Sequence, residues 1–195
     1  GGVYIVYSGG GDLSFTGNQI TDNTATYTGN ATAGGVRFQL TGSGTVNISN
    51  NTISGNSSPQ YGGLNLYVSN SQVEFHGNTI IGNSSTANSH SNRISVISQN
   101  LFYQNNMINN TGTIHHSESY GTDSYVGNNW WGTTNSTELQ ALIYDFEDDP
   151  NLGTLSTSPV LTAPSTSAPP SPPQNVAAQT GPTSIQLSWS ANPES

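Results

Sequence analysis

Short runs in which apolar and polar residues alternate recur along the chain, and each run contains an asparagine. In the first four runs, apolar residues stand five and three positions before the asparagine and two positions after it, and the last run departs only at Ser124. The runs cover residues 13–20, 46–53, 73–80, 101–108 and 124–131. Alternation with a period of two predicts β-strands that bury one face, so each run should supply a set of inward-facing side chains.

The asparagines of these runs predict a polar ladder at a turn. They are Asn18, Asn51, Asn78, Asn106 and Asn129. An asparagine tolerates the left-handed backbone of a tight turn, and its side-chain amide can bond to the equivalent amide of the next repeat. A structural role therefore explains these residues better than a ligand-binding role.

A second strand, led by two glycines, precedes each alternating run. It covers residues 1–5, 34–38 and 62–66, and a fourth copy at residues 93–96 has lost its glycines but keeps Ile94 and Val96 as inward positions. Repeats of about 20–30 residues with two or three short strands predict a solenoid, in which like residues stack about 4.8 Å apart. The expected inward ladders are Leu13, Val46, Val73 and Leu101; Phe15, Ile48, Phe75, Tyr103 and Val126; and Ile20, Ile53, Ile80, Ile108 and Trp131.

The Gly-Gly-x-x-(Ile/Phe/Leu) strands, together with Asn-x-Ile-x-x-Asn turns such as residues 51–56, resemble the right-handed parallel β-helix repeats of the pectin-lyase-like family. The resemblance covers residues 1–132. It implies an all-β fold, a right-handed parallel β-helix solenoid of about five coils. A leucine-rich repeat is the main rival solenoid, but it needs a helical segment and a Leu-x-x-Leu-x-Leu pattern, and neither is found in the repeats.

Residues 133–161 are expected to cap the end of this solenoid. Residues 128–132 (Asn-Asn-Trp-Trp-Gly) and the pattern that follows them resemble the Trp-Gly element that closes many β-helices. A cap of this kind covers strand edges that otherwise invite aggregation. We expect a short helix within residues 138–144, capped by Thr134 or Ser136, with Leu139, Leu142 and Ile143 facing inward.

Two further segments follow the cap. Residues 162–173 are rich in Pro and Ser and should form an extended, semi-rigid linker. Residues 174–195 resemble the first two strands of a fibronectin-type-III domain, in which Trp189 would fill the core. A complete immunoglobulin-like sandwich needs about 100 residues. We therefore expect this truncated tail to be incomplete by itself, and both ends of the sequence look like cuts in a longer chain.

Composition excludes several functions. The net charge is −9, there is no lysine, and the only arginines are Arg37 and Arg93. We therefore expect no nucleic-acid binding and no attraction to anionic membranes, and no apolar run is long enough to suggest membrane insertion. The chain has no cysteine for disulfides or thiolate metal sites. These features favour an extracellular or cell-surface protein of a prokaryote. Asn-x-Ser/Thr triplets, such as those at Asn56 and Asn83, accept glycans only in a glycosylating host.

Residues suited to catalysis do not form a set in this sequence. Lyases of the resembled family generally use an Arg or Lys base, but Arg37 alternates with inward-facing Val36 and Phe38 and should be an ordinary surface residue. Hydrolases need convergent carboxylates, and no pair aligns in the repeats. We expect no catalytic residues. The weak candidates for metal ligands are Asp145, Glu147, Asp148 and Asp149, whose oxygens could bind calcium. These residues lack the spacing and glycine of a calcium loop, which favours a solvated acidic cap and no cofactor.

Loops of variable length connect each asparagine turn to the next strand and should project from one edge of the solenoid. Insertions at the same place in every repeat often form a binding face. The candidate binding residues in these loops are Tyr27, Tyr61, His90, His115, His116 and Tyr120. Aromatic side chains among Asn and Ser suit contacts with sugars or with other proteins.

The sequence thus favours a non-catalytic, structural or adhesive protein of the cell surface, such as a subunit of a filament or surface layer. Its partners would be other copies of itself, other surface proteins or glycans. Two alternatives stay open. One is a polysaccharide lyase or glycoside hydrolase whose catalytic coils lie upstream of Gly1. The other is a glycan-binding module that uses the loop face.

Overall fold

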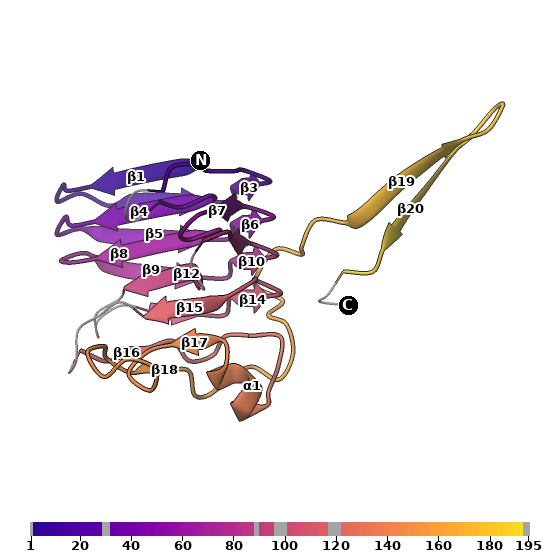
Figure 1. Cartoon of the computed structure of the whole chain (residues 1–195). Helices are drawn as coiled ribbons and strands as arrows, with labels where there is room; N and C mark the ends of the chain where they lie inside the picture. Colours follow the sequence, from indigo (N-terminus) through magenta and orange to yellow (C-terminus); the bar gives the residue numbers. More distant parts are fainter. Residues whose placement is uncertain (1, 29–31, 88–89, 96–100, 117–121, 193–195) are drawn as a thin grey trace.

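A computed structural model describes residues 2–28, 32–87, 90–95, 101–116 and 122–192 of the chain. The protein is all-β, and its main body consists of parallel sheets to which successive repeats contribute one strand each (Figure 1). The largest sheet has six strands, in the order β1 (Val3–Tyr7), β4 (Val36–Leu40), β8 (Leu64–Val68), β12 (His90–Ser95), β15 (Thr113–His116) and β17 (Ile143–Tyr144).

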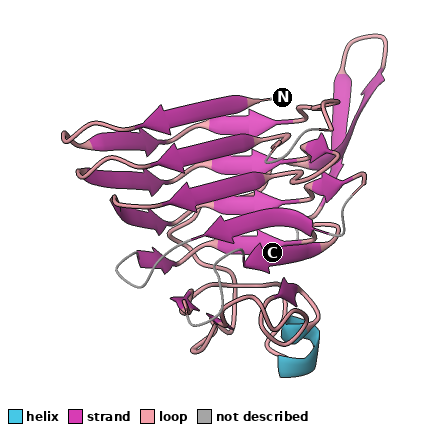
Figure 2. Cartoon of the chain, turned by 60° about the vertical axis from the view of Figure 1, so that its left-hand side comes forward, coloured by secondary structure: helices cyan, strands magenta, loops and turns pink. Residues whose placement is uncertain are grey.

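Two four-stranded sheets complete the stacked part (Figure 2). One contains β2 (Leu13–Thr16), β5 (Thr45–Ser49), β9 (Gln72–His76) and β13 (Leu101–Tyr103). The other contains β3 (Gln19–Thr21), β6 (Thr52–Ser54), β10 (Thr79–Ile81) and β14 (Asn106–Ile108). Short pairs are formed by β7 (Ser57–Ser58) with β11 (Ser84–Ser85), and by β16 (Ser124–Tyr125) with β18 (Leu155–Ser156).

The core lies between these sheets and is built from the alternating apolar positions. Like residues pair across neighbouring strands, as in Val46 with Val73 and Ile48 with Phe75. Phe75 in turn stacks on Phe102, with ring centroids 4.6 Å apart and planes 2° apart. Burying each such side chain contributes roughly 1.5–3 kcal/mol, so the repeated pattern supplies a continuous hydrophobic core.

The fourth alternating run is shifted by one residue from the predicted register. Phe102, not Tyr103, pairs with Phe75, and Leu101 pairs with Glu74 and is 51% exposed. Met107 rather than Ile108 then occupies the third ladder. The period-two pattern could not choose the frame, because residues 101–103 are three consecutive apolar residues and residues 105–106 are two consecutive asparagines. The predicted inward residue Val96 lies outside the described residues.

A ladder of asparagines runs through the turns, as predicted, with Asn105 in the place expected for Asn106. Its members are Asn18, Asn51, Asn78, Asn105 and Asn129. In each step the backbone N–H and the Nδ2 of one asparagine both donate to the Oδ1 of the next, over 2.8–3.0 Å. The buried turns are therefore held by side chains that satisfy one another.

A second asparagine ladder, absent from the predictions, lies five residues further along each repeat. It contains Asn23, Asn56, Asn83 and Asn110, joined by the same pair of bonds over 3.0–3.1 Å. The signal was present in the Asn-x-Ile-x-x-Asn spacing. Asn56 and Asn83 are completely buried with their amides bonded, so these two triplets are not glycan acceptors in the folded chain.

The cap combines a short helix with a strand. Helix α1 (Ser136–Gln140) begins after Asn135, whose side chain accepts bonds from two backbone N–H groups, so neither Thr134 nor Ser136 is the cap residue. The helix is shorter than predicted, and Ile143 instead belongs to β17, which adds a strand to the six-stranded sheet. Trp131 closes the core and is 2% exposed.

The tail forms an antiparallel hairpin of β19 (Gln174–Thr180) and β20 (Ile185–Ser190), which projects away from the stacked sheets (Figure 1). Its apolar side chains are exposed, including Val176, Ile185, Leu187 and Trp189. Among the described residues, no helix has both the length and the apolar character needed to cross a membrane.

Candidate functional site

The outer face of the six-stranded sheet carries one row of aromatic, cationic and amide side chains. The row is in register from β1 to β17 and consists of Tyr4, Arg37, Asn65, Arg93, His115 and Tyr144. The row faces away from the core, because its neighbours in the strands, such as Val36 and Phe38, are buried there, although Asn65 in the middle of the row is itself 0% exposed. Both arginines of the sequence therefore lie in a single row on one face.

One end of this row belongs to a histidine–tyrosine cluster formed by Tyr61, His90, His115 and Tyr144. The imidazoles of His90 and His115 are stacked, with centroids 4.6 Å apart and planes 20° apart. The ring of Tyr144 lies 4.7 Å from His90 and 5.6 Å from His115. The Tyr61 hydroxyl lies 3.3 Å from His115 Nδ1. The cluster presents aromatic rings and ring nitrogens side by side.

The strands explain why these four side chains meet. His115 on β15 lies directly opposite Tyr144 on β17. His90 begins β12, where the register shifts between His90 and Asn92, and its Nδ1 lies 2.7 Å from the Thr113 hydroxyl. A local irregularity of this kind re-aims a side chain, and here it brings His90 over the β15 imidazole.

The two imidazoles of the cluster are uncharged at neutral pH, because their pKa values are lowered. Burial first, and then electrostatic interaction with His90, Arg93 and His116, lower the pKa of His115 to about 4, against the opposing effect of Asp149. Burial also lowers the pKa of His90, against Asp148, and raises that of Tyr61, against Arg93. Neutral imidazoles offer one donor and one acceptor each, so the site suits polar, uncharged groups.

The predicted binding residues divide into four sets. Tyr61, His90 and His115 are brought together in the cluster. His116 points the other way and is fully buried, with its ring nitrogens near the carbonyls of Ile94 and Thr122. Adjacent residues on a strand face opposite sides, so His116 does not belong to this surface. Tyr120 lies outside the described residues.

Tyr27 lies apart from the cluster, at the other end of the sheet. It is 73% exposed and lines a hollow of about 410 Å³ together with Tyr4 and Arg37. The guanidinium of Arg37 lies 4.8 Å from the centre of the Tyr4 ring, within the range of a cation–π interaction. The outer row therefore has an aromatic group at each end.

Tyr144 was missing from the candidate residues. The segment that contains Tyr144 was predicted to be the end of a helix. A residue assigned to a helix has no predicted strand partner. The Ile143–Tyr144 pair does have the apolar-in, polar-out order of an edge strand, but two residues are too few for a periodic signal.

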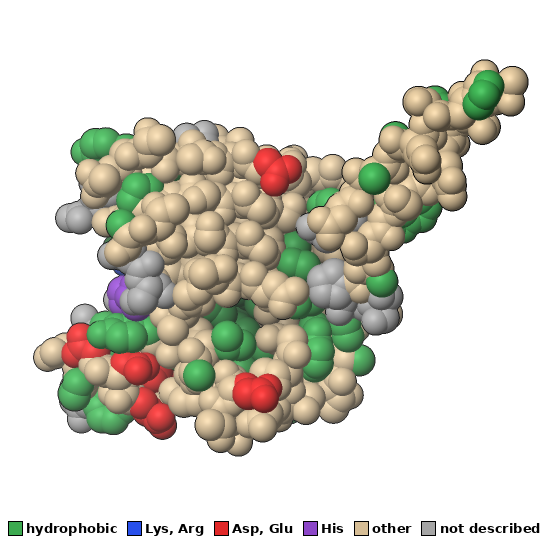
Figure 3. All heavy atoms as spheres, turned by 45° about the vertical axis from the view of Figure 1, so that its right-hand side comes forward, with side chains coloured by type: hydrophobic (Ala, Val, Ile, Leu, Met, Phe, Trp, Pro, Cys, Tyr) green, Lys and Arg blue, Asp and Glu red, His purple; other side chains and the backbone are tan. Residues whose placement is uncertain are grey.

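The acidic residues of the cap form turns. Asp145 is buried, and its two carboxylate oxygens accept the backbone N–H groups of Glu147 and Leu155, over 3.1 and 2.8 Å. Asp149 accepts the backbone and side-chain N–H groups of Asn151, which lower its pKa. Figure 3 shows acidic side chains gathered at the cap end, next to a histidine. In the described part of the chain, no group of three or more His, Asp or Glu is arranged to hold a metal ion.

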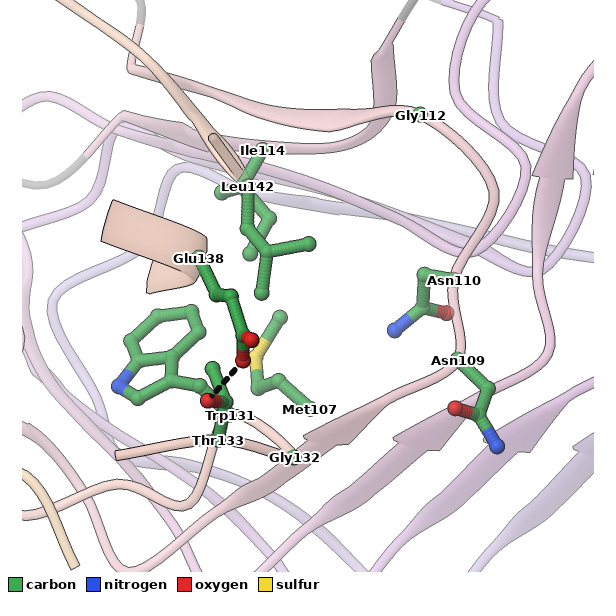
Figure 4. Close-up of a pocket in the computed structure, with 10 residues that line it drawn as sticks. All are labelled: Met107, Asn109, Asn110, Gly112, Ile114, Trp131, Gly132, Thr133, Glu138 and Leu142. Atoms are coloured by element: carbon green, nitrogen blue, oxygen red, sulfur yellow. Dashed lines mark hydrogen bonds between the residues drawn. The ribbon is translucent and has the colours of Figure 1, made fainter. Parts of the chain in front are cut away.

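A further pocket of about 230 Å³ lies at the seam between the fourth repeat and the cap (Figure 4). Met107, Ile114 and Leu142 form its apolar wall. Glu138, which accepts a bond from Thr133, faces Asn110 across it. The second asparagine ladder ends at Asn110, so this pocket lies where the stacked repeats end and the helix of the cap begins.

The fold and site define an all-β protein of stacked parallel sheets with an aromatic and histidine-containing outer face. Comparison with models of protein families, with curated proteins and with solved structures found no match.

Proposed function

We propose that this chain is a non-catalytic, adhesive module of an extracellular or cell-surface protein, and that it binds glycans through the histidine–tyrosine cluster. In this proposal the stacked sheets are a right-handed parallel β-helix of the pectin-lyase-like kind, and the hairpin begins a fibronectin-type-III-like domain. The parallel, in-register pairing of successive repeats supports the first part. The Trp189 position in β20 supports the second.

The stacked pair His90–His115, flanked by Tyr61 and Tyr144, is the observation that carries the binding function. A sugar ring presents C–H groups on its faces and hydroxyls at its rim. Aromatic rings with a polar edge match this arrangement, because the ring covers the C–H face while the hydroxyl or nitrogen bonds at the rim. The lowered pKa values keep both imidazoles neutral, so binding does not require a charged ligand.

The roles of the neighbouring charged groups support a non-catalytic site. Both carboxylate oxygens of Asp145 and the Oδ1 of Asp149 accept hydrogen bonds within the turns of the cap. Arg37 stacks on Tyr4 and donates to Gln39, over 3.3 Å. A glycosidase needs two carboxylates that flank the bond to be cleaved, and these contacts fit a structural role instead. Catalytic coils upstream remain the alternative, to be tested by assays for polysaccharide cleavage.

The test is a screen on glycan arrays and insoluble polysaccharides, followed by affinity measurements with any ligand that binds. We expect Tyr144→Ala and His115→Ala each to weaken binding by at least about tenfold, which corresponds to 1.4 kcal/mol. Tyr125→Ala is the matched control, because Tyr125 is an exposed tyrosine on β16, which does not belong to the six-stranded sheet. Absence of any glycan ligand, or equal loss in all three variants, contradicts the proposal.

Assembly is a second candidate function, favoured by the hairpin. Ile185 and Leu187 lie on one face, because they pair with Thr180 and Ala178, while Gln179 and Gln186 pair on the other face. Exposed apolar patches of this kind commonly mark contacts with other proteins. Sedimentation that depends on concentration, and is abolished by Leu187→Ser, would support assembly. A monomer at all concentrations contradicts it.

A further inference from the structure

The Pro/Ser-rich segment 162–173 lies against the outer face of the sheet formed by β3, β6, β10 and β14, and its first anchor is Asn106. The side-chain amide of Asn106 accepts the backbone N–H of Ser165 over 2.7 Å and donates to the carbonyl of the same residue over 3.2 Å. Asn106 is buried at the start of β14. Residues 165–168 form a turn in which the Ala168 N–H donates to the Ser165 carbonyl over 3.3 Å, and the Asn106 amide bonds to both backbone groups of the residue that starts this turn.

The next anchors follow the sheet from strand to strand. The hydroxyl of Thr79, which pairs with Asn106 across the sheet, donates to the carbonyl of Pro169. Between these anchors the carbonyl of Ser167 lies over Gly77, where an added Cβ would stand only 2.9 Å from its oxygen. Gly77 also has a φ of +58°, so glycine is favoured there for two reasons. The surface of the sheet under the segment therefore allows the segment's backbone to approach closely.

The composition of the Pro/Ser-rich segment suits this surface. Prolines have no N–H to leave unsatisfied, hold an extended backbone and leave their carbonyls free to accept bonds. Ala168 and Ser171 are 9% and 2% exposed. Pro172 and Pro173 continue over a hollow of about 410 Å³ lined by residues of β3, β6 and β10.

The same segment is also hydrogen-bonded to the residues that follow the second strand of the hairpin. Asn192, which follows β20, donates through Nδ2 to the carbonyl of Ser171, over 2.8 Å. The hairpin therefore contacts the segment both where β19 begins and just after β20 ends. Figure 1 shows the segment running beside β14 and β10 before the hairpin departs.

We propose that the outer face of the β3–β6–β10–β14 sheet is a docking groove for a Pro/Ser-rich peptide, and that the chain's own residues 165–173 are its occupant. Docking converts the linker into a rigid strap, which sets the direction in which the hairpin and whatever follows it leave the stacked sheets. This inference concerns a different face from the histidine–tyrosine cluster and does not depend on glycan binding.

The test compares Ala168→Glu with Ala163→Glu in the full chain. Both substitutions add the same charge to the same segment, but Ala168 is buried against the groove and Ala163 is exposed. We expect Ala168→Glu to release the strap, giving about tenfold faster amide hydrogen exchange over residues 165–171 and a larger maximum dimension in X-ray scattering. Ala163→Glu should match the parent chain in both measurements.

A variant of the groove provides the second arm. Asn106→Ala removes the amide that holds Ser165 and should accelerate exchange in the same residues, whereas Asn70→Ala, at an exposed turn elsewhere, should not. Because Ala168→Glu leaves the sheets untouched, a folding defect in Asn106→Ala does not decide the outcome. Exchange and dimensions that stay unchanged in Ala168→Glu overturn the proposal. Protection that appears only at high protein concentration also overturns it, because the occupant would then be another copy.

Discussion

The stacked sheets and the terminal hairpin use the same alternation of apolar and polar residues, yet only the stacked sheets bury it. In β4 the apolar residues Val36, Phe38 and Leu40 are completely inaccessible to solvent. In β20 the equivalent alternation leaves Trp189 61% exposed. The difference lies in what faces the strand. Strands of the stack meet the apolar faces of two other sheets, whereas the hairpin is a single layer with solvent on both faces. Alternation makes a strand possible, and a facing layer makes it stable.

The largest expected effect is the loss of a core ring in the stack. Phe75→Ala should lower the free energy of unfolding by about 4 kcal/mol, because it removes a buried ring and leaves a cavity against Phe102. Trp189→Ala, on the hairpin, should change the same free energy by less than about 0.5 kcal/mol. Denaturant unfolding monitored by far-ultraviolet circular dichroism measures both. Equal losses would mean that the hairpin has a buried partner within the chain.

The next effect is the loss of a ladder asparagine. Asn78→Ala should cost about 3 kcal/mol, because it removes the oxygen that accepts both N–H groups of Asn51 and leaves these buried donors unsatisfied. The hairpin offers a matched change in Asn175→Ala, since Asn175 donates to Ser190 on an exposed surface. We expect this control to leave the unfolding of the stacked sheets unchanged in the same assay. A cost below about 1 kcal/mol for Asn78→Ala would show that the ladder is not a main source of stability.

A smaller effect is a dependence of stability on pH in the stack alone. The pKa of His115 is about 4 in the folded chain, below the ordinary histidine value of 6.5. As pH falls below 6.5, the unfolded chain binds a proton that the folded chain does not, so stability present above 6.5 is lost progressively down to pH 4. The full shift corresponds to about 3 kcal/mol, and partial solvent access reduces the expected loss to about 2 kcal/mol.

The difference between the parent chain and His115→Gln isolates this contribution from the carboxylates that titrate nearby. Melting temperatures measured from pH 7.5 to 4 should converge on the acidic side, with the variant showing the flatter curve. Parallel curves for the two proteins would contradict the assignment of the effect to His115. No described residue of the hairpin is a histidine, so substitutions there should leave the curve unchanged.

Particular residues show how far the sequence could be followed. The first three repeats were predicted in register, because in each of them the two apolar residues before the asparagine are separated by a polar residue, which leaves a single frame. The fourth repeat failed by one residue, since residues 101–103 and 105–106 fit two frames equally well. Stacking of Phe102 on Phe75 decides between them, and that contact joins residues 27 positions apart.

The candidate site shows the same division. Tyr61, His90 and His115 were predicted to be binding residues because they lie in loops that occupy the same position in each repeat. Tyr144 was not, because its position opposite His115 depends on β17 joining the sheet after the helix. His116 was included because exposure cannot be read from a loop prediction, while the structure places it on the inward side of β15.

The sequence by itself determined the strands, the asparagine turns and the aromatic and charge inventory of this protein, because these depend on residues close together in the chain. The tertiary structure alone decided the frame of the fourth repeat, the meeting of two histidines and two tyrosines on one face, and the docking of the Pro/Ser segment. Each of these depends on distant residues that become neighbours only when repeats stack about 4.8 Å apart, and no local pattern specifies which of them will meet.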